Sequence, residues 1–421
     1  MRLMTMLRPL SRPLSRLMLC LVVWITMAAH VTLAQGPAAK SKPRAKENPQ
    51  VRVKSLGQIA QHLGIGQGSV IADIGAGAGR DSWVFAQIVG GEGKVYSVEI
   101  DASRVESLKA DAQQRKLSQI QPILSRTDDP CLPPDSVDMA FMHNVYHHVT
   151  EPQPMLQGIW QGLKPGGYLV VVDQRLGTLI DWVPREQRGP KHFWIAETTV
   201  VREARENGFR FVEYADPLWH VREAFVLIFQ RPEDLQAPDR DPDPLPPIPA
   251  DTVRQLLPET GQTYQRVAFV ALGPGRELIA PYLAAHPCQA IDIVLEEWAT
   301  QKDERPPLPP GVELPSVLTD RGDPQLGSEP LDAVYFLDTY HLLFHGPTLL
   351  GHLRDRLTDS GRIYILDRQA PSVIPHREAS HRRMIAAETV QQQMHEAGFA
   401  LVREGTQPTQ DRFLLVFQKS E

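Results

Sequence analysis

The sequence predicts an α/β protein made of two tandem doubly wound, Rossmann-like domains, each with a mostly parallel seven-stranded sheet that includes an antiparallel edge strand. Three observations lead to this prediction. Short β-branched runs alternate with helical stretches, which is typical of successive βαβ units. The same order of short motifs occurs in both halves of the chain. In each half, the last two strands follow one another without a helix between them, which implies antiparallel pairing.

Length and composition agree with two folded domains. A chain of 421 residues exceeds what one hydrophobic core usually serves. The formal net charge of −6 is small for this length and gives no electrostatic reason to expect a nucleic-acid partner. Outside the N-terminal segment the only cysteines are Cys131 and Cys288, one in each half. Neither half can form an internal disulfide, and the sequence indicates no cysteine-based metal site.

The N-terminal segment has the layout of a secretory signal peptide. Four arginines (Arg2, Arg8, Arg12 and Arg16) precede an apolar run over residues 17–29, and the small-x-small pattern Thr32-Leu33-Ala34 comes before Gln35. We therefore expect a signal peptide over residues 1–34, a linker over residues 35–50, and a periplasmic or secreted protein. The alternative is an uncleaved membrane anchor, because the apolar run extended to Ala34 approaches the minimum spanning length.

The first domain, residues 51–230, opens with its most informative motif. An apolar strand ends near Asp73, and the chain turns through Gly75, Gly77 and Gly79 into a predicted helix. Glycines at such a turn let the main chain approach a small ligand closely. A dinucleotide fingerprint requires G-x-G-x-x-G, but Arg80 stands at the last glycine position, which disfavours a nicotinamide enzyme. The next strand, over residues 94–100, carries Glu99 near its end.

Strand, acidic residue, close-set glycines and a following Glu99 resemble motif I and the next strand of the class I S-adenosylmethionine-dependent methyltransferases. The resemblance covers most of residues 51–230 and implies S-adenosylmethionine as cofactor. It implies that Glu99 accepts hydrogen bonds from the ribose hydroxyls, and that Asp73 and the three glycines form the cofactor turn. It also places Asp128 opposite the adenine amino group. The alternative for Asp128 is a turn residue that caps a helix.

The fourth strand, residues 137–142, delivers Asn144, Tyr146, His147 and His148 at its carboxyl end, where open α/β sheets bind ligands. This segment resembles small-molecule methyltransferases that carry a Tyr-His motif, which implies a cofactor contact for Asn144. His147 is the candidate base for an acceptor hydroxyl or amine. Its alternative is a structural hydrogen bond at the turn. The connection over residues 173–195, with aromatic residues at 182, 193 and 194 and His192, is the expected acceptor side.

A proline-rich stretch over residues 231–250 predicts an extended linker. In the following domain, residues 251–421, the segment Leu331-Asp332 to His341 repeats the pattern of residues 137–147. Opposite the first glycine motif it has Ala271, Gly273, Gly275 and Glu277, so the carboxylate is lost. Glu296 is the nearest match to the ribose carboxylate. We expect a degenerate copy; the alternative is a second active centre.

The sequence thus predicts an exported S-adenosylmethionine-dependent methyltransferase acting on a small-molecule acceptor, with an inactive second domain. The acceptor itself is not specified. We expect no nucleic-acid partner and no membrane association apart from the N-terminal segment. The rival prediction is a noncatalytic exported binding protein on the same fold, because the methyl donor is made in the cytoplasm.

Overall fold

The computed structural model describes residues 48–174, 195–221, 224–234, 247–259, 261–270, 274–288, 290–294, 323–324, 326, 328–343, 346–405, 407 and 409–420. The predicted signal segment and most of the proline-rich linker lie outside these residues. Among the helices within them, none has the length and apolar character needed to cross a membrane.

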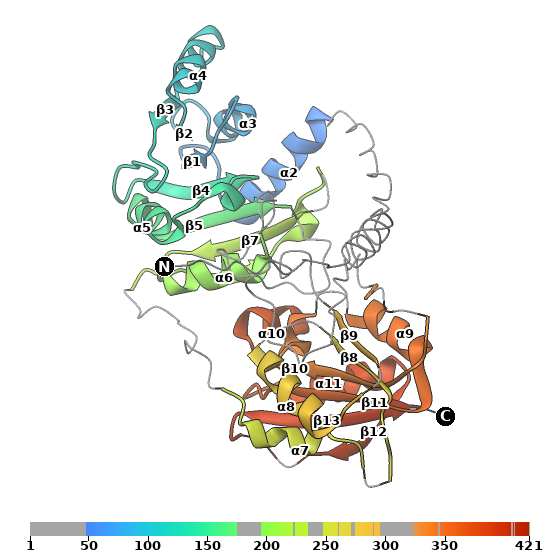
Figure 1. The fold of residues 1–421 in the computed structure, drawn as a ribbon. Helices are drawn as coiled ribbons and strands as arrows, with labels where there is room; N and C mark the ends of the chain where they lie inside the picture. Colours follow the sequence, from blue (N-terminus) through green and yellow to red (C-terminus); the bar gives the residue numbers. More distant parts are fainter. Residues whose placement is uncertain are drawn as a thin grey trace, which may run out of the picture. The chain divides into compact units, whose positions relative to one another are not determined.

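The first sheet has seven strands in the order β3-β2-β1-β4-β5-β7-β6 (Figure 1). Its central strands are parallel, and β7 pairs antiparallel with both β5 and β6. These strands are apolar runs because both faces of a doubly wound sheet are covered. Their bounds are β1 (Val70–Ile74), β2 (Lys94–Glu99), β3 (Ile120–Leu124), β4 (Val137–His143), β5 (Leu163–Asp173), β6 (Arg210–Tyr214) and β7 (Phe225–Gln230).

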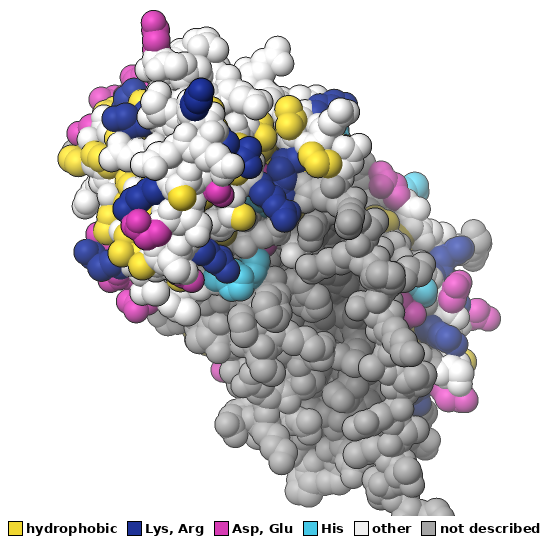
Figure 2. All heavy atoms as spheres, turned by 90° about the horizontal axis from the view of Figure 1, so that it is seen from above, with side chains coloured by type: hydrophobic (Ala, Val, Ile, Leu, Met, Phe, Trp, Pro, Cys, Tyr) yellow, Lys and Arg dark blue, Asp and Glu magenta, His cyan; other side chains and the backbone are white. Residues whose placement is uncertain are grey.

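Helices cover both faces of this sheet (Figure 1). One core layer contains Leu56 of α2 and Phe85 of α3, and the other contains Leu156 of α5 and Val200 of α6. The helical segments are α2 (Pro49–His62), α3 (Arg80–Val89), α4 (Ala102–Gln114), α5 (Pro152–Gly162), α6 (Glu197–Glu206) and the 3-10 turns η1 (Tyr146–His148) and η3 (Asp216–Leu218). On the face drawn in Figure 2, basic, acidic and apolar side chains are interspersed where the residues are described.

The second sheet has six strands among the described residues, in the order β12-β13-β11-β10-β8-β9. Read from β9, this order repeats that of the first sheet from β2 to β6, including the antiparallel β13. The bounds are β8 (Arg266–Val270), β9 (Ala290–Val294), β10 (Leu331–Leu337), β11 (Leu357–Arg368), β12 (Phe399–Glu404) and β13 (Arg412–Lys419). The predicted α/β class with two mostly parallel sheets is confirmed.

The helical segments of the second domain also follow the first. The 3-10 turn after β10 repeats the Tyr-His turn after β4. The segments are η4 (Ala250–Thr252), α7 (Val253–Leu256), η5 (Pro274–Leu278), α8 (Ile279–Ala285), η8 (Tyr340–Leu342), α9 (Gly346–Arg356), α10 (His376–Arg382) and α11 (Ala387–Glu396). Two buried clusters pack on this sheet, one including Val390 of α11 and the other Tyr282 of α8.

Candidate functional site

The turn after β1 packs against the ends of the neighbouring strands β2 and β4. Gly75 has φ 73°, and a Cβ there would overlap the side chain of Val145, which follows β4. The backbone N–H groups of Gly75 and Ala76 both donate to the carbonyl of Val98, at 2.8 and 3.0 Å. Only glycine therefore fits at position 75 without strain and overlap. The turn brings the main chain to the edge of the sheet where β2 and β4 also end.

Glu99, at the end of β2, is held by backbone amides. Its Oε2 accepts from the N–H of Gly77 at 2.9 Å, and its Oε1 accepts from those of Ile100 and Asp101 at 3.0 and 3.2 Å. The side chain is 5% exposed. A carboxylate has about four acceptor positions, so these three bonds fix its orientation and leave capacity for a further donor.

A cavity of about 420 Å³ opens between these strand ends. Its wall includes Ile74 and Gly75 from the turn, Glu99 and Ile100 from the end of β2, and Asn144 and Val145 after β4. Ile100 is 59% exposed and gives the cavity an apolar surface beside the carboxylate. The volume is that of a small-molecule site, in which an apolar wall and a few polar groups fix a ligand.

The cavity gathers three of the residues that the sequence predicted for the cofactor: Gly75, Glu99 and Asn144. Gly77 and Gly79 do not line it. The N–H of Gly77 supports Glu99, and Gly79, with φ 74°, precedes α3 where a Cβ would overlap Trp83. These assignments to the cofactor remain predictions, and the glycines are required by local packing as well.

Asp73 and Asp128 lie beside the cavity without lining it. Asp73 is 3% exposed, and its Oδ2 accepts from the hydroxyl of Ser82 at 2.6 Å. Burial, together with the charge of Asp81, raises the pKa of Asp73 to about 7. Asp128 lies 3.4 Å from the Nε of Arg126, and Ser125 and Thr127, shortly before it in the sequence, line the cavity. This geometry tests neither the predicted cofactor contact of Asp73 nor that of Asp128.

His147, the predicted base, is 4% exposed and is absent from the cavity wall. Its Nδ1 lies 2.7 Å from Oδ1 of Asp173, whose Oδ2 accepts from the backbone N–H of His147 at 3.2 Å. The second domain repeats this arrangement with His341 and Asp367, at 2.7 Å. Because a domain without the glycine motif keeps the same pair, the contact is best explained as holding the turn after the strand. A catalytic role for His147 remains a prediction.

The sequence reasoning missed a polar network at the end of β4. The Nδ1 of His143 lies 2.8 Å from Oδ2 of Asp81, while Arg52 of α2 forms an ion pair with the other oxygen of Asp81. The Nε2 of His143 lies 2.9 Å from Nδ2 of Asn144. His143 and Asn144 both line the cavity. The available signal was the place of His143 directly before Asn144, but strand four was ended one residue too early.

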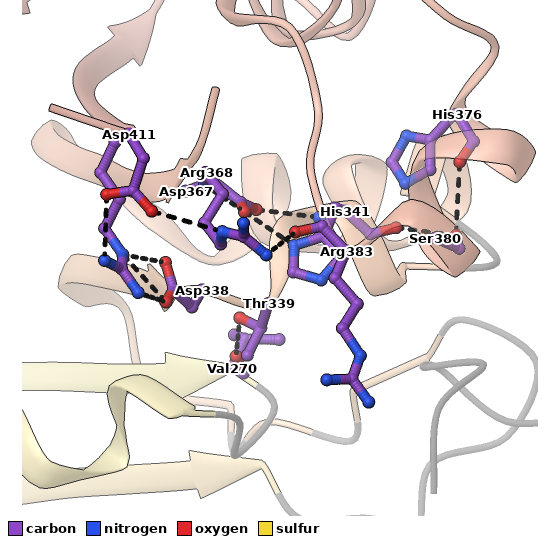
Figure 3. Close-up of polar contacts among 11 residues, drawn as sticks. Val270, Asp338, Thr339, His341, Asp367, Arg368, His376, Ser380, Arg383 and Asp411 are labelled. Atoms are coloured by element: carbon purple, nitrogen blue, oxygen red, sulfur yellow. Dashed lines mark hydrogen bonds and ion pairs between the residues drawn. The ribbon is translucent and has the colours of Figure 1, made fainter. Parts of the chain in front are cut away.

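The second domain has a different arrangement at the equivalent strand end (Figure 3). Asp338 replaces Asn144 and has a similar backbone conformation, with φ 57° against 54°. Its carboxylate accepts from Nη2 of Arg412 at 2.8 Å, and both side chains are fully buried. Leu337 stands in the place of His143, and a Cβ on Gly275 would overlap it. An internal ion pair thus fills the position that faces the cavity in the first domain.

Several predicted features lie outside the described residues. These are Ala271, Gly273, Glu296 and the aromatic connection with Trp182, His192, Phe193 and Trp194. Glu277, at the third glycine position of the second domain, is described and is exposed. On the side where the sequence predicts the acceptor, the described cavity wall comes from β4, η1, α5 and the loops between them, and it includes His148, Thr150 and Met155.

Comparisons with known proteins agree with the predicted family. Residues 65–207 match the family model of a methyltransferase domain. Human arsenite methyltransferase is 28% identical over 145 residues, which cover 32% of this chain and 37% of the human protein. The chain thus spans little more than a third of that relative's length.

Two solved structures are similar to part of this chain. A SAM-dependent methyltransferase from Aquifex aeolicus is 20% identical in sequence, with a TM-score of 0.38. The match covers 44% of this chain and 94% of the Aquifex protein. An arsenic(III) S-adenosylmethionine methyltransferase from Chlamydomonas reinhardtii is 21% identical in sequence, with a TM-score of 0.33. The match covers 46% of this chain and 76% of the Chlamydomonas protein.

Proposed function

We propose that this chain, whose residues 65–207 belong to the class I methyltransferase family, transfers a methyl group from S-adenosylmethionine to a small-molecule acceptor. The observation that carries the proposal is Glu99 at the wall of the cavity, beside the glycine turn. A buried carboxylate held by three backbone amides is a strong acceptor for hydroxyl donors.

The cavity fits the adenosyl part of this cofactor. Its volume of about 420 Å³ lies in the range of small-molecule sites. Glu99 would hold the ribose hydroxyls, and the exposed side chain of Ile100 would cover a purine face. Gly75 keeps the main chain close to Val145, so that a ligand can lie against the backbone at this edge.

Methyl transfer requires little from the protein beyond alignment of the methyl donor and the acceptor. When bound, S-adenosylmethionine supplies an electrophilic methyl carbon on a positively charged sulfur. The residues of this chain would orient the reactants, and the apolar wall from Met142 and Met155 would exclude water from the reacting atoms. His148, which lines the cavity and is exposed, is better placed than buried His147 to accept a proton from an acceptor.

Arsenite is not supported as the acceptor. Trivalent arsenic binds soft thiolate ligands, as other soft metal and metalloid centres do. The chain has three cysteines, Cys20, Cys131 and Cys288, and none of them belongs to the described wall of the cavity. We therefore propose an acceptor with a nucleophilic nitrogen, oxygen or carbon atom.

Calorimetric titration with S-adenosylmethionine and S-adenosylhomocysteine tests the proposal. We expect micromolar or tighter binding to the wild-type chain, and a loss of about tenfold or more for Glu99→Gln, because an amide NH₂ would face a backbone N–H. Glu106→Gln is the matched control, since Glu106 is exposed on α4 and contacts Lys109. Equal affinities for wild type and Glu99→Gln would contradict the proposed site.

A noncatalytic binding protein is the second candidate. It is favoured by the arginine-rich, apolar N-terminal segment, because this segment predicts export and the methyl donor is made in the cytoplasm. The two functions differ in turnover. Transfer of a labelled methyl group to any component of an envelope extract supports the enzyme, whereas tight binding without transfer supports the binding protein. We propose export as well, and the mass of the mature protein tests it: cleavage at the predicted site leaves Gln35 as the first residue.

We propose that the second domain does not bind the cofactor. Asp338 and Arg412 satisfy each other at the strand end where the first domain presents Asn144 to the cavity. The proposal predicts one binding site per chain. A calorimetric stoichiometry of two would contradict it.

A further inference from the structure

The protonation pattern of the network at the end of β4 follows from its partners. Burial alone would raise the pKa of Asp81, but the hydrogen bond from His143 and the charge of Arg52 lower it. Asp81 is thus a carboxylate, which can only accept hydrogen bonds. The Nδ1 of His143, 2.8 Å from Oδ2 of Asp81, must therefore carry a proton. Arg52 Nη1 lies 3.3 Å from the same nitrogen, so that both atoms of this contact are hydrogen-bond donors.

The contact with Asn144 fixes the role of the other ring nitrogen of His143. The Nδ2 of Asn144 lies 2.9 Å from Nε2 of His143, and an amide nitrogen can only donate a hydrogen bond. Nε2 is therefore the acceptor, while Nδ1 donates to Asp81. The side chains of His143 and Asp81 are buried, with 7% and 8% exposed.

The amide of Asn144 is oriented by this acceptor. Its Nδ2 donates to Nε2 of His143, so the nitrogen side of the amide is held toward the ring. The amide oxygen then points elsewhere, and no described residue donates to it. Asn144 lies in the cavity wall and keeps φ 54°, a conformation that Asn and Asp adopt more readily than most side chains.

We propose that Asp81 and His143 are positioning residues that fix the Asn144 oxygen as the acceptor for an ammonium group bound in the cavity. The proposal rests on the proposed function, because the ammonium is the α-amino group of S-adenosylmethionine. A fixed amide oxygen favours this donor without the cost of ordering a mobile side chain. The second domain lacks the arrangement: Leu337 provides no acceptor, and Arg412 occupies the Asp338 carboxylate.

Two ligands separate this role from a general contribution to the cavity. S-adenosylhomocysteine carries the α-ammonium group, whereas 5′-methylthioadenosine has the same nucleoside and thioether without it. Calorimetry with both ligands is run on wild type, His143→Leu and His143→Gln. His143→Leu removes the acceptor and introduces the residue of the second domain. His143→Gln offers an oxygen that can replace Nε2 as the acceptor.

We expect His143→Leu to weaken S-adenosylhomocysteine binding by about tenfold or more, and 5′-methylthioadenosine binding by less than about twofold. His143→Gln restores most of the lost affinity. In Asp81→Asn the carboxylate no longer fixes which ring nitrogen of His143 carries the proton, so we expect the same selectivity between the two ligands. This variant replaces His143→Leu in the test if His143→Leu fails to fold. Glu99→Gln weakens both ligands, because it acts on the ribose they share.

Equal losses of both ligands in His143→Leu and Asp81→Asn, or no loss at all, overturn this inference and leave the proposed function standing. If the wild-type protein binds neither ligand, the proposed function fails, and the inference fails with it.

Discussion

The carboxyl group of Asp73 makes the stability of the first domain depend on pH. Its pKa is about 7 in the folded protein, against 3.8 for an unperturbed Asp, because it is fully buried and close to Asp81. Between these values the folded state holds a proton that the unfolded chain has lost. The free energy of unfolding therefore falls as pH rises, by about 1.4 kcal/mol per pH unit. Over the whole window the Asp73 contribution amounts to about 4 kcal/mol.

Replacing Asp73 by Asn removes this titration and keeps an oxygen for the Ser82 hydroxyl. We expect the stability of Asp73→Asn relative to wild type to increase by about 4 kcal/mol between pH 4 and pH 8. Urea unfolding followed by tryptophan fluorescence measures it, since Trp83, Trp160 and Trp219 lie in the first domain.

Asp111→Asn, a substitution at an exposed position of α4, controls for the loss of one negative charge. If the two variants showed the same pH dependence relative to wild type, the buried, protonated state of Asp73 would be refuted.

Two further predictions concern packing. Gly75→Ala should lower the free energy of unfolding by about 2–4 kcal/mol, because of the left-handed φ and the overlap with Val145. Gly64→Ala, with φ 69° and open space around it, should lower it by only about 1–2 kcal/mol. Similar losses for the two variants in urea unfolding would argue against the close contact of Gly75 with Val145. Arg412→Met should destabilise the second domain by about 3 kcal/mol because it leaves buried Asp338 unpaired, and Asp338→Asn in the same chain should recover part of the loss. Calorimetric unfolding of the single and double variants measures the coupling, and additive losses would contradict it.

The glycine turn and Glu99 could be predicted from the sequence because they are local features. The turn is a run of consecutive residues at the end of an apolar strand, and Glu99 ends the next strand along the chain. Parallel neighbours place those two ends at one edge of the sheet, so order in the sequence was sufficient to bring them together.

The network around His143 could not be predicted in the same way. Its three charged or titratable members come from α2, α3 and β4, and nothing in the spacing of Arg52, Asp81 and His143 marks them as neighbours. The same holds for Arg412, which meets Asp338 only because β13 returns antiparallel beside β11. Long-range pairings of this kind depend on the packing of whole elements.

The sequence predicted that the second domain lacks the counterpart of the Asp73 carboxylate, because Ala271 stands in its place, and that Glu296 is the nearest match to the ribose carboxylate. Glu296 and Ala271 lie outside the described residues, so that prediction still rests on the sequence. What the structure adds is the buried Asp338–Arg412 pair. The sequence did not indicate this pair, because the position in the first domain that matches Arg412 is occupied by Ala224, which cannot form an ion pair.

A crystal structure of the protein with S-adenosylhomocysteine tests the central claim most directly. We predict ligand density in the first-domain cavity, with both ribose hydroxyls within hydrogen-bonding distance of the Glu99 carboxylate and the purine against Ile100. Density at another place in the chain, or a ribose that makes no contact with Glu99, would contradict the account.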